Sequence, residues 1–399
     1  MNRQFPSYMH LYHYSTVGRP YTDSRITTKK INARWYTVGI LCALSSPSSL
    51  SACTGIRIKT TDGASIYART MEFPFDLKSA IIAIPKNKAL AGTLPDGTAG
   101  IKWKTKYAAV GINALKKDHF LDGVNEKGLA FGALYFPGYA HYQPIAPHEH
   151  KVTLAPWELG TWLLTTCATV DDVKRALEKI KIGAVSTGAS GIVIEPMGPD
   201  FVPPLHYIVH DAQGNSIVIE PNKKTLTIQD NPIGTITNSP YFDWHLINLK
   251  NYVNLTPYNA PSVHWDDFTI YPAGQGSGML GLPGDFTPPS RFIRAASLSI
   301  AALPAATAYD GVGVAISILN NITIAKGMIR ETEPTGIIYE YTHWISVADL
   351  KNCCFYYRTY ENHCYHQIDL KTLIFEDSKI KRLGMEEKAV YDNVTEKLK

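Results

Sequence analysis

The stretch CTGIRIKTTDGASIYARTMEF, residues 53–73, has the pattern of a β-hairpin. Polar and apolar residues alternate along Cys53–Ile58, the dipeptide Asp62-Gly63 predicts a turn, and a second strand is expected at Ser65–Arg69. A cysteine therefore opens a hairpin that we expect in the core of the protein. Such a placement favours a catalytic role for the cysteine over attachment to a flexible tether.

The residues before Cys53 have the three-part layout of a secretory signal. A basic stretch at 29–34 precedes an apolar run at 35–44 and small polar residues up to Ala52, and the apolar run is too short to span a bilayer. Cleavage after Ala52 would place a thiol and a free α-amine on Cys53, the nucleophile and the base of amide hydrolases that act through their own N-terminus. We therefore expect a leader and signal peptide at 1–52 and one domain at 53–399, exported to the periplasm or secreted.

The same junction supports a second interpretation. Leu50-Ser51-Ala52-Cys53 also resembles a lipobox, after which the cysteine is lipidated and the protein anchored. Lipidation would consume the thiol, and the chain would then be a lipid-anchored binding protein without enzymatic activity. We favour the enzyme, because the chain enters a strand directly after Cys53, whereas lipoproteins usually continue with a flexible polar tether.

The composition excludes several functions. Six of the 39 Lys and Arg residues precede Cys53, against one of the 35 Asp and Glu residues, so residues 53–399 carry 33 basic and 34 acidic side chains. No basic surface is left to indicate a nucleic-acid partner, and no later segment has the length of a membrane span. We expect no metal site and no organic cofactor. Buried thiols fit the four remaining cysteines at least as well as disulfides do; these are Cys167, Cys353, Cys354 and Cys364.

Strands and helices are expected in separate groups along the chain. The groups are strands within 53–136, helices within 156–180, strands within 205–220, helices within 290–319 and strands within 337–368. Thr169 and Asp172 form a capping box that predicts the start of a helix at 170–180. Grouping of this kind favours antiparallel sheets with helices on their outer faces over an alternating parallel fold.

Several short motifs follow one another in a fixed order. They are Cys53-Thr54-Gly55, Ala68-Arg69-Thr70-Met71-Glu72, residues 123–129, Phe136-Pro137-Gly138-Tyr139, Thr237-Asn238-Ser239-Pro240, residues 281–285, Ser290-Arg291-Phe292, Ile318-Leu319-Asn320-Asn321, Lys326-Gly327 and Tyr341-Thr342-His343-Trp344. Together they show that the chain resembles the choloylglycine hydrolases, which include conjugated bile acid hydrolases and penicillin V acylases among the N-terminal nucleophile (Ntn) hydrolases. The resemblance covers Cys53 to about Leu370. It implies an α+β fold, an αββα sandwich of two antiparallel sheets between helical layers, and a homo-oligomer, a tetramer in the family.

The resemblance also assigns roles around the thiol. Cys53 matches the family's nucleophile, and its α-amine the base, which is partly neutral near pH 7 because its reference pKa is about 8. Arg69 matches the arginine beside the thiol, where a cation favours the thiolate. Glu72 stands where most family members have Asp, and the match implies that its carboxylate holds the α-amine.

Three further residues match the family's machinery for the oxyanion. Asn238 matches an oxyanion-hole amide, although the residue alone fits a turn before Ser239-Pro240 equally well. Tyr135 is expected to contribute its backbone N–H to the same hole. Arg291 matches a second active-site arginine, with Arg294 as the alternative.

The predicted reaction is the hydrolysis of a linear, non-peptide amide with an apolar acyl group, through an acyl-thioester on Cys53. Aromatic residues such as Phe73 and Phe75 would line the acyl pocket or belong to the core. We rank a conjugated bile acid first as substrate, penicillin V second, and keep N-acyl homoserine lactones as a further alternative. The partner is thus a small molecule, with no nucleic acid and no membrane span.

Overall fold

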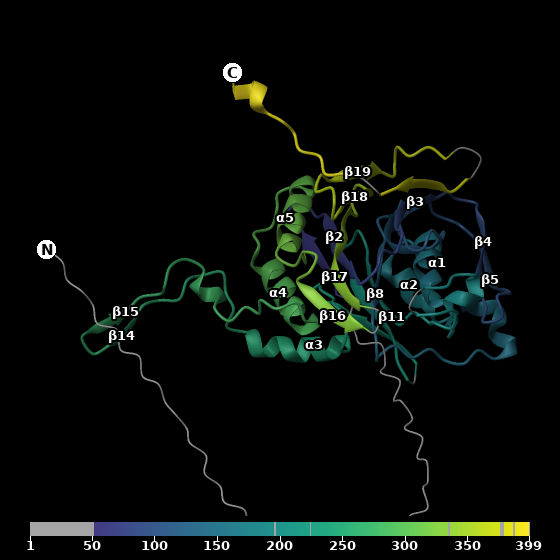
Figure 1. Ribbon diagram of the computed structural model, residues 1–399, viewed down its shortest axis with the longest axis horizontal. Coiled ribbons are helices and arrows are strands. Elements are labelled where there is room, and N and C mark those ends of the chain that lie inside the picture. The colour runs from purple at the N-terminus through teal and green to yellow at the C-terminus, as the bar shows by residue number, and fades with distance from the viewer. Residues whose placement is uncertain are drawn as a thin grey trace, which may run out of the picture. The chain divides into compact units, whose positions relative to one another are not determined.

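A computed structural model describes residues 52–194, 197–223, 225–333, 336–375, 379–385 and 388–398 (Figure 1). Apart from Ala52, the leader and signal predicted at 1–52 lie outside these described residues. None of the helices in the described part of the chain combines the length and the apolar character that a bilayer-crossing segment needs.

Two large antiparallel sheets form the centre of the molecule. The first has the strand order β1 (Cys53–Lys59), β2 (Ser65–Phe73), β17 (Gly336–Asp349), β18 (Cys354–Thr359) and β19 (His366–Asp369), with β16 (Ile329–Glu333) also paired to β17. The second has the order β13 (Leu226–Asp230), β12 (Ser216–Pro221), β11 (Leu205–His210), β8 (Ala130–Tyr135), β7 (Phe120–Asn125), β6 (Ala109–Asn113), β3 (Ala80–Ile84) and β20 (Lys381–Gly384). Smaller pairs are β4 (Ala89–Thr93) with β5 (Ala99–Lys104), β9 (Thr153–Leu154) with β10 (Lys181–Ile182), and β14 (Val263–Trp265) with β15 (Phe268–Ile270).

Helices cover the outer face of each sheet (Figure 1). Helices α4 (Pro288–Ala301) and α5 (Ala308–Asn320) pack on the first sheet, whereas α1 (Leu159–Thr166) and α2 (Val170–Leu177) pack on the second. The largest apolar cluster lies between the two sheets and includes Cys53. The predicted αββα sandwich is therefore confirmed.

The hairpin of β1 and β2 forms as the alternation predicts, and its register places the thiol. Cys53 pairs with Met71, and residues two apart on a strand share a face. Tyr67, Arg69 and Met71 accordingly face the second sheet, where Arg69 reaches a β8 carbonyl. Glu72 is three residues from Arg69, so its side chain lies on the opposite face of the first sheet. Helices α4 and α5 cover that face.

Several boundaries differ from the predicted ones. The capping box of Thr169 and Asp172 is present, but the helix ends at Leu177, before the predicted residue 180. Within the strand group expected at 337–368, the longest strand is β17, which has a bulge between Thr342 and Trp344. Ile236, outside the expected strand groups, forms a single antiparallel bridge with Gly55.

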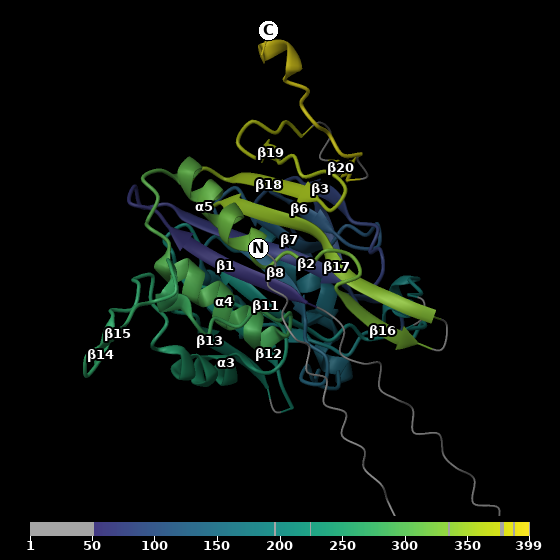
Figure 2. The same ribbon diagram turned by 60° about the vertical axis from the view of Figure 1, so that its left-hand side comes forward.

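The segment before α4 holds elements that the sequence pattern did not predict. Helix α3 (Phe242–Leu249) and the hairpin of β14 and β15 lie between residues 242 and 270. Figures 1 and 2 both show this hairpin projecting from the rest of the fold. Its strands have only three residues each, too few for an alternation to be recognised.

Candidate active site

The thiol of Cys53 lies at the start of β1, buried between the sheets with 1% of the residue exposed. Arg69 Nη2 donates to Cys53 Sγ at 3.2 Å, and Met71 Sδ lies 3.6 Å from the same sulfur. Burial raises the pKa of the Cys53 thiol, and the Arg69 guanidinium opposes that rise. The cation thus offsets part of the cost of forming a thiolate in an apolar interior.

Arg69 is held by the second sheet. Its Nη1 donates to the carbonyl of Ala133 at 2.6 Å, and its Nε lies 3.9 Å from Asp122 Oδ2. The Asp122 carboxylate also accepts from Tyr67 Oη and Ser346 Oγ, at 2.7 Å each. Because all of these groups are buried, the guanidinium has a fixed position beside the sulfur.

Asn238 connects the backbone of Cys53 with Arg291. Its Oδ1 accepts from Cys53 N at 2.7 Å and from Arg291 Nη2 at 2.8 Å. Its Nδ2 donates one hydrogen to the carbonyl of Tyr135 at 2.8 Å. An amide nitrogen carries two hydrogens, so Nδ2 has a second one to offer an oxyanion formed at the thiol.

Tyr135 is the last residue of β8, and its ring packs edge-on against Phe73 with centroids 5.6 Å apart. Burial raises the pKa of the Tyr135 phenol to about 12. The pairing of β8 with β7 ends at Gly132. The backbone N–H of Tyr135 therefore lies beyond the paired part of that edge, as the predicted role in an oxyanion hole requires.

Arg291, on α4, reaches from the outer face of the first sheet to the backbone of Cys53. Its Nη1 donates to Cys53 O at 2.6 Å and to Thr54 Oγ1 at 2.7 Å. Arg294, the alternative considered from the sequence, instead donates to the carbonyls of Pro283 and Asp285. Of the two arginines, Arg291 is therefore the one that contacts the backbone of Cys53.

Glu72 lies on the face of β2 that carries Thr70. Its carboxylate accepts from Thr70 Oγ1 at 3.0 Å and from Thr342 Oγ1 at 2.6 Å. Burial raises the pKa of Glu72 to about 7, against the lowering effect of the Arg291 cation. Glu72 thus belongs to the charged group around Arg291, and its assignment as the holder of the α-amine stays a prediction.

The sequence analysis did not identify two buried carboxylates, those of Asp122 and Glu340, as candidate site residues. Asp122 precedes the motif at 123–129, and Glu340 precedes the motif that begins at Tyr341. The Glu340 carboxylate accepts from Ala52 N, and burial raises its pKa to about 7. The sequence does contain a feature that could have identified both residues. Each is an acidic residue inside an otherwise apolar strand, next to a motif of the family.

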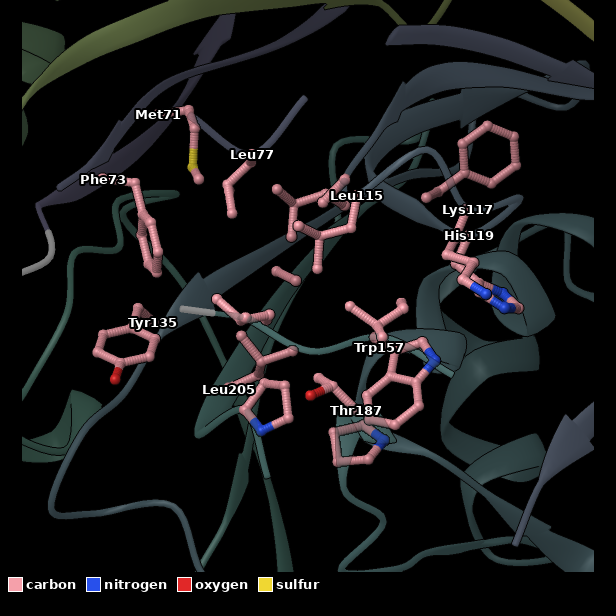
Figure 3. A pocket seen from close by; sticks show the side chains of 18 of the residues that line it. Met71, Phe73, Leu77, Leu115, Lys117, His119, Tyr135, Trp157, Thr187 and Leu205 are labelled. Carbon is pink, nitrogen blue, oxygen red and sulfur yellow. The ribbon is translucent and has the colours of Figure 1, made fainter. Parts of the chain in front are cut away.

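A cavity of about 850 Å³, its mouth included, is lined by Cys53 and mostly apolar side chains. Figure 3 shows Met71, Phe73 and Tyr135 on one side of this cavity and His119, Trp157 and Thr187 on the other. Since Met71 contacts the thiol, the first side is the reactive end.

A sequence profile described as linear amide C-N hydrolases, choloylglycine hydrolase family, matches residues 53–381. The chain belongs to the choloylglycine hydrolase family. A bile salt hydrolase/transferase of Clostridium perfringens is 35% identical over 333 residues, which cover 82% of this chain and 95% of the relative. A penicillin V acylase of Pectobacterium atrosepticum is 24% identical over 327 residues, 78% of each chain.

The solved structures agree with the family assignment. The crystal structure of a mutant conjugated bile acid hydrolase from Clostridium perfringens superposes with a TM-score of 0.73 at 32% identity, covering 86% of this chain and all of that one. This choloylglycine hydrolase family member is therefore a linear amide hydrolase with the Ntn fold. The family and the fold predicted from the ordered motifs are confirmed.

Proposed function

We propose that the chain hydrolyses the amide bond of conjugated bile acids. The observation that carries the proposal is a buried thiol 3.2 Å from a buried guanidinium at one end of an apolar cavity. Relatives named for bile salt hydrolysis are more similar to this chain than the relative named as a penicillin V acylase, at 35% against 24% identity. A cavity of this character fits an apolar acyl group whose polar amide lies at the thiol.

The geometry supports a two-step reaction. The Cys53 thiolate attacks the amide carbonyl, and Asn238 Nδ2 with the Tyr135 N–H stabilises the oxyanion. The α-amine of Cys53, having taken the thiol proton, returns a proton to the leaving nitrogen, which departs and leaves an acyl-thioester. Water, activated by the same amine, then hydrolyses the thioester and regenerates the thiol.

We further propose that the chain is exported and cleaved after Ala52. The base of this mechanism exists only when Cys53 N is free, and that nitrogen lies 2.7 Å from Asn238 Oδ1, which would hold the amine. The match to the family profile begins at Cys53, which supports the same start for the mature protein. Lipidation at Cys53 is the competing outcome.

The experiment compares three substrates on the chain beginning at Cys53: a glycine-conjugated bile acid, penicillin V and an N-acyl homoserine lactone. We expect the highest kcat/KM on the bile acid conjugate and no turnover by Cys53→Ala. A higher kcat/KM on penicillin V would overturn the substrate assignment, whereas turnover by Cys53→Ala would overturn the mechanism. Mass spectrometry of the exported protein separates a free Cys53 from an acylated one.

We also propose that copies of the chain associate through the hairpin of β14 and β15. Trp265 and Phe268 are each 67% exposed at its turn. Large apolar side chains gathered on a projecting element mark an interaction surface. A homo-oligomer would bury them.

A further inference from the structure

Two buried histidines hold the backbone around Asn238. His206 Nε2 donates to the carbonyl of Thr237 at 2.8 Å, and His245 Nε2 donates to the carbonyl of Asn238 at 3.1 Å. The two histidines are 1% and 2% exposed. Residues 237–240 lie outside helices and strands, so these carbonyls belong to neither a sheet ladder nor a helical turn. The two imidazoles give this irregular backbone the hydrogen bonds that a regular element would supply itself.

Stacking fixes the plane of each imidazole ring. His206 lies on Phe136 with centroids 4.0 Å and planes 5° apart, and His245 lies on Phe292 with centroids 4.6 Å and planes 15° apart. Phe136 directly follows the residue expected to offer its backbone N–H to the oxyanion, and Phe292 directly follows the arginine that contacts Cys53. The two histidines are thus packed against the same backbone segments that carry the site.

Glu220, on β12, connects the two histidines. Its Oε1 accepts from the backbone N–H of Phe242, the first residue of α3, at 3.0 Å, and lies 3.3 Å from His206 Nδ1. The residue is 1% exposed, and a carboxylate at the start of a helix is favoured there. His245 lies three residues further along α3. One carboxylate therefore orients the ring of His206 and the helix that carries His245.

The hydrogen of His245 is committed to the Asn238 backbone. Burial lowers the pKa of His245 to about 4, so the ring is neutral at pH 7 and carries one hydrogen. Because a carbonyl oxygen only accepts, that hydrogen is on Nε2. His245 Nδ1 has no hydrogen-bond partner among the described residues. A phenyl ring in place of the imidazole would therefore remove the bond to Asn238 and keep the ring's shape.

We propose that His245 is a positioning residue for the reaction, which holds the backbone of Asn238 so that the second hydrogen of Nδ2 points at the oxyanion. The inference rests on the proposed function, because it takes Asn238 as an oxyanion donor. Cys53 N and Arg291 fix the outer end of the Asn238 side chain through Oδ1, and His245 fixes its backbone end. A donor of this kind acts only when it is held in place before the charge develops.

A loss of position should appear in kcat more than in KM. The oxyanion exists in the transition state and not in the bound substrate, so a misplaced donor raises the barrier and leaves substrate binding largely unchanged. A general loosening of the fold would instead affect substrate binding and stability as well. The split between kcat and KM therefore separates positioning from a merely structural role.

The test measures kcat and KM for two variants, on whichever of the three substrates named above wild type hydrolyses best. His245→Phe keeps a ring for the stack on Phe292 and loses the N–H, whereas His245→Gln loses the ring and offers an N–H near the place of Nε2. We expect His245→Phe to lower kcat about tenfold with KM within about twofold, and His245→Gln to recover most of the loss. Equal losses of kcat in the two variants, or a change confined to KM, would overturn the inference.

The control on the same helix is Ile247→Ala, since Ile247 is 60% exposed on α3. It should keep the kcat of wild type. A double-mutant cycle then asks whether His245 acts through Asn238. In the Asn238→Ala background, His245→Phe should change kcat by less than about twofold, because there is no longer an amide to position. A further tenfold loss in that background would overturn the inference.

Crystal structures keep this outcome apart from failure of the proposed function. If wild type hydrolyses none of the three substrates, the proposed function fails and the position of the Asn238 amide decides the inference. Asn238 Oδ1, 2.7 Å from Cys53 N in the present structure, should stay within hydrogen-bond distance in His245→Gln and leave it in His245→Phe. The same position of the amide in the two variants would overturn the inference.

Discussion

Arg69 is the cation that contacts the thiol, and the Asp122 carboxylate lies near the same guanidinium. The two side chains are buried, with Arg69 Nε 3.9 Å from Asp122 Oδ2 and Nη2 3.2 Å from Cys53 Sγ. In an interior of low dielectric constant, a neighbouring charge changes a pKa strongly. We therefore expect the reactivity of Cys53 to depend on the Asp122 carboxylate, which acts through Arg69.

We predict that Asp122→Asn lowers the pKa of the Cys53 thiol. The substitution removes the negative charge of Asp122, which partly neutralises the positive charge of Arg69. The thiolate of Cys53 is then stabilised more strongly by Arg69. The rate of alkylation by iodoacetamide, measured against pH, should show its midpoint at lower pH. Tyr67→Phe is the control, because it removes a 2.7 Å hydrogen bond to Asp122 but keeps the charge. A midpoint unchanged in Asp122→Asn, in a folded variant, would contradict the prediction.

We predict that Glu72→Gln reduces kcat and moves the acidic limb of the pH–rate profile to lower pH. A carboxylate near the α-ammonium raises the amine's pKa, so its removal lowers that pKa and the base becomes active at lower pH. Glu72→Asp should also be slower, because a shorter side chain shifts the carboxylate out of place. The measurement is kcat/KM against pH. Profiles and rates equal to wild type in both variants would remove Glu72 from the site.

At the level of elements, the hairpin of β14 and β15 differs from the rest of the fold. Most strands of the two large sheets bury apolar side chains against a helical layer or the other sheet. The hairpin instead exposes its side chains, including those of Val263 and Phe268. An element with exposed apolar residues and a two-stranded ladder is only marginally stable on its own.

We predict that Trp265→Ser combined with Phe268→Ser lowers the oligomeric state. The substitutions remove apolar area that association would bury, and they touch no residue of the active site. Light scattering after size-exclusion chromatography should show a smaller species than wild type. Tyr309→Ser is the control, since Tyr309 is 78% exposed on α5, a different element. An unchanged mass would show that the hairpin does not mediate association.

On the scale of the whole molecule, the Ala52–Cys53 bond, at which we propose cleavage, lies inside the fold. Ala52 is 3% exposed and its N–H donates to the Glu340 carboxylate. Cys53 N is an amide nitrogen while Ala52 is attached, and an amide cannot accept a proton from the thiol. If cleavage after Ala52 frees the amine as proposed, folding and activation are separate events in this chain.

We predict that the full chain, with residues 1–52 attached, is folded and inactive. A chain that begins Met-Cys53 and is trimmed by the host should be active, because only then is the α-amine free to act as base. Circular dichroism checks the fold, and amide hydrolysis checks the activity. Equal activity from the two chains would rule out the terminal amine as the base.

The local sequence determined the elements that a short pattern can specify. The hairpin at 53–73 follows from its alternation and its Asp62-Gly63 turn, and α2 begins at its capping box. The ordered motifs identified the family and with it the αββα arrangement. The alternation of side chains along a strand also places Arg69 and Glu72 on opposite faces of β2, because they are three residues apart.

Only the tertiary structure decided what surrounds those residues. Asn238 fits a turn when taken alone, and it meets Cys53 N across 185 residues of sequence. Asp122 and Glu340 gain their roles from strands that pack against β1 and β2. Contacts between residues far apart in sequence depend on how sheets and helices pack, and no local periodicity records that packing.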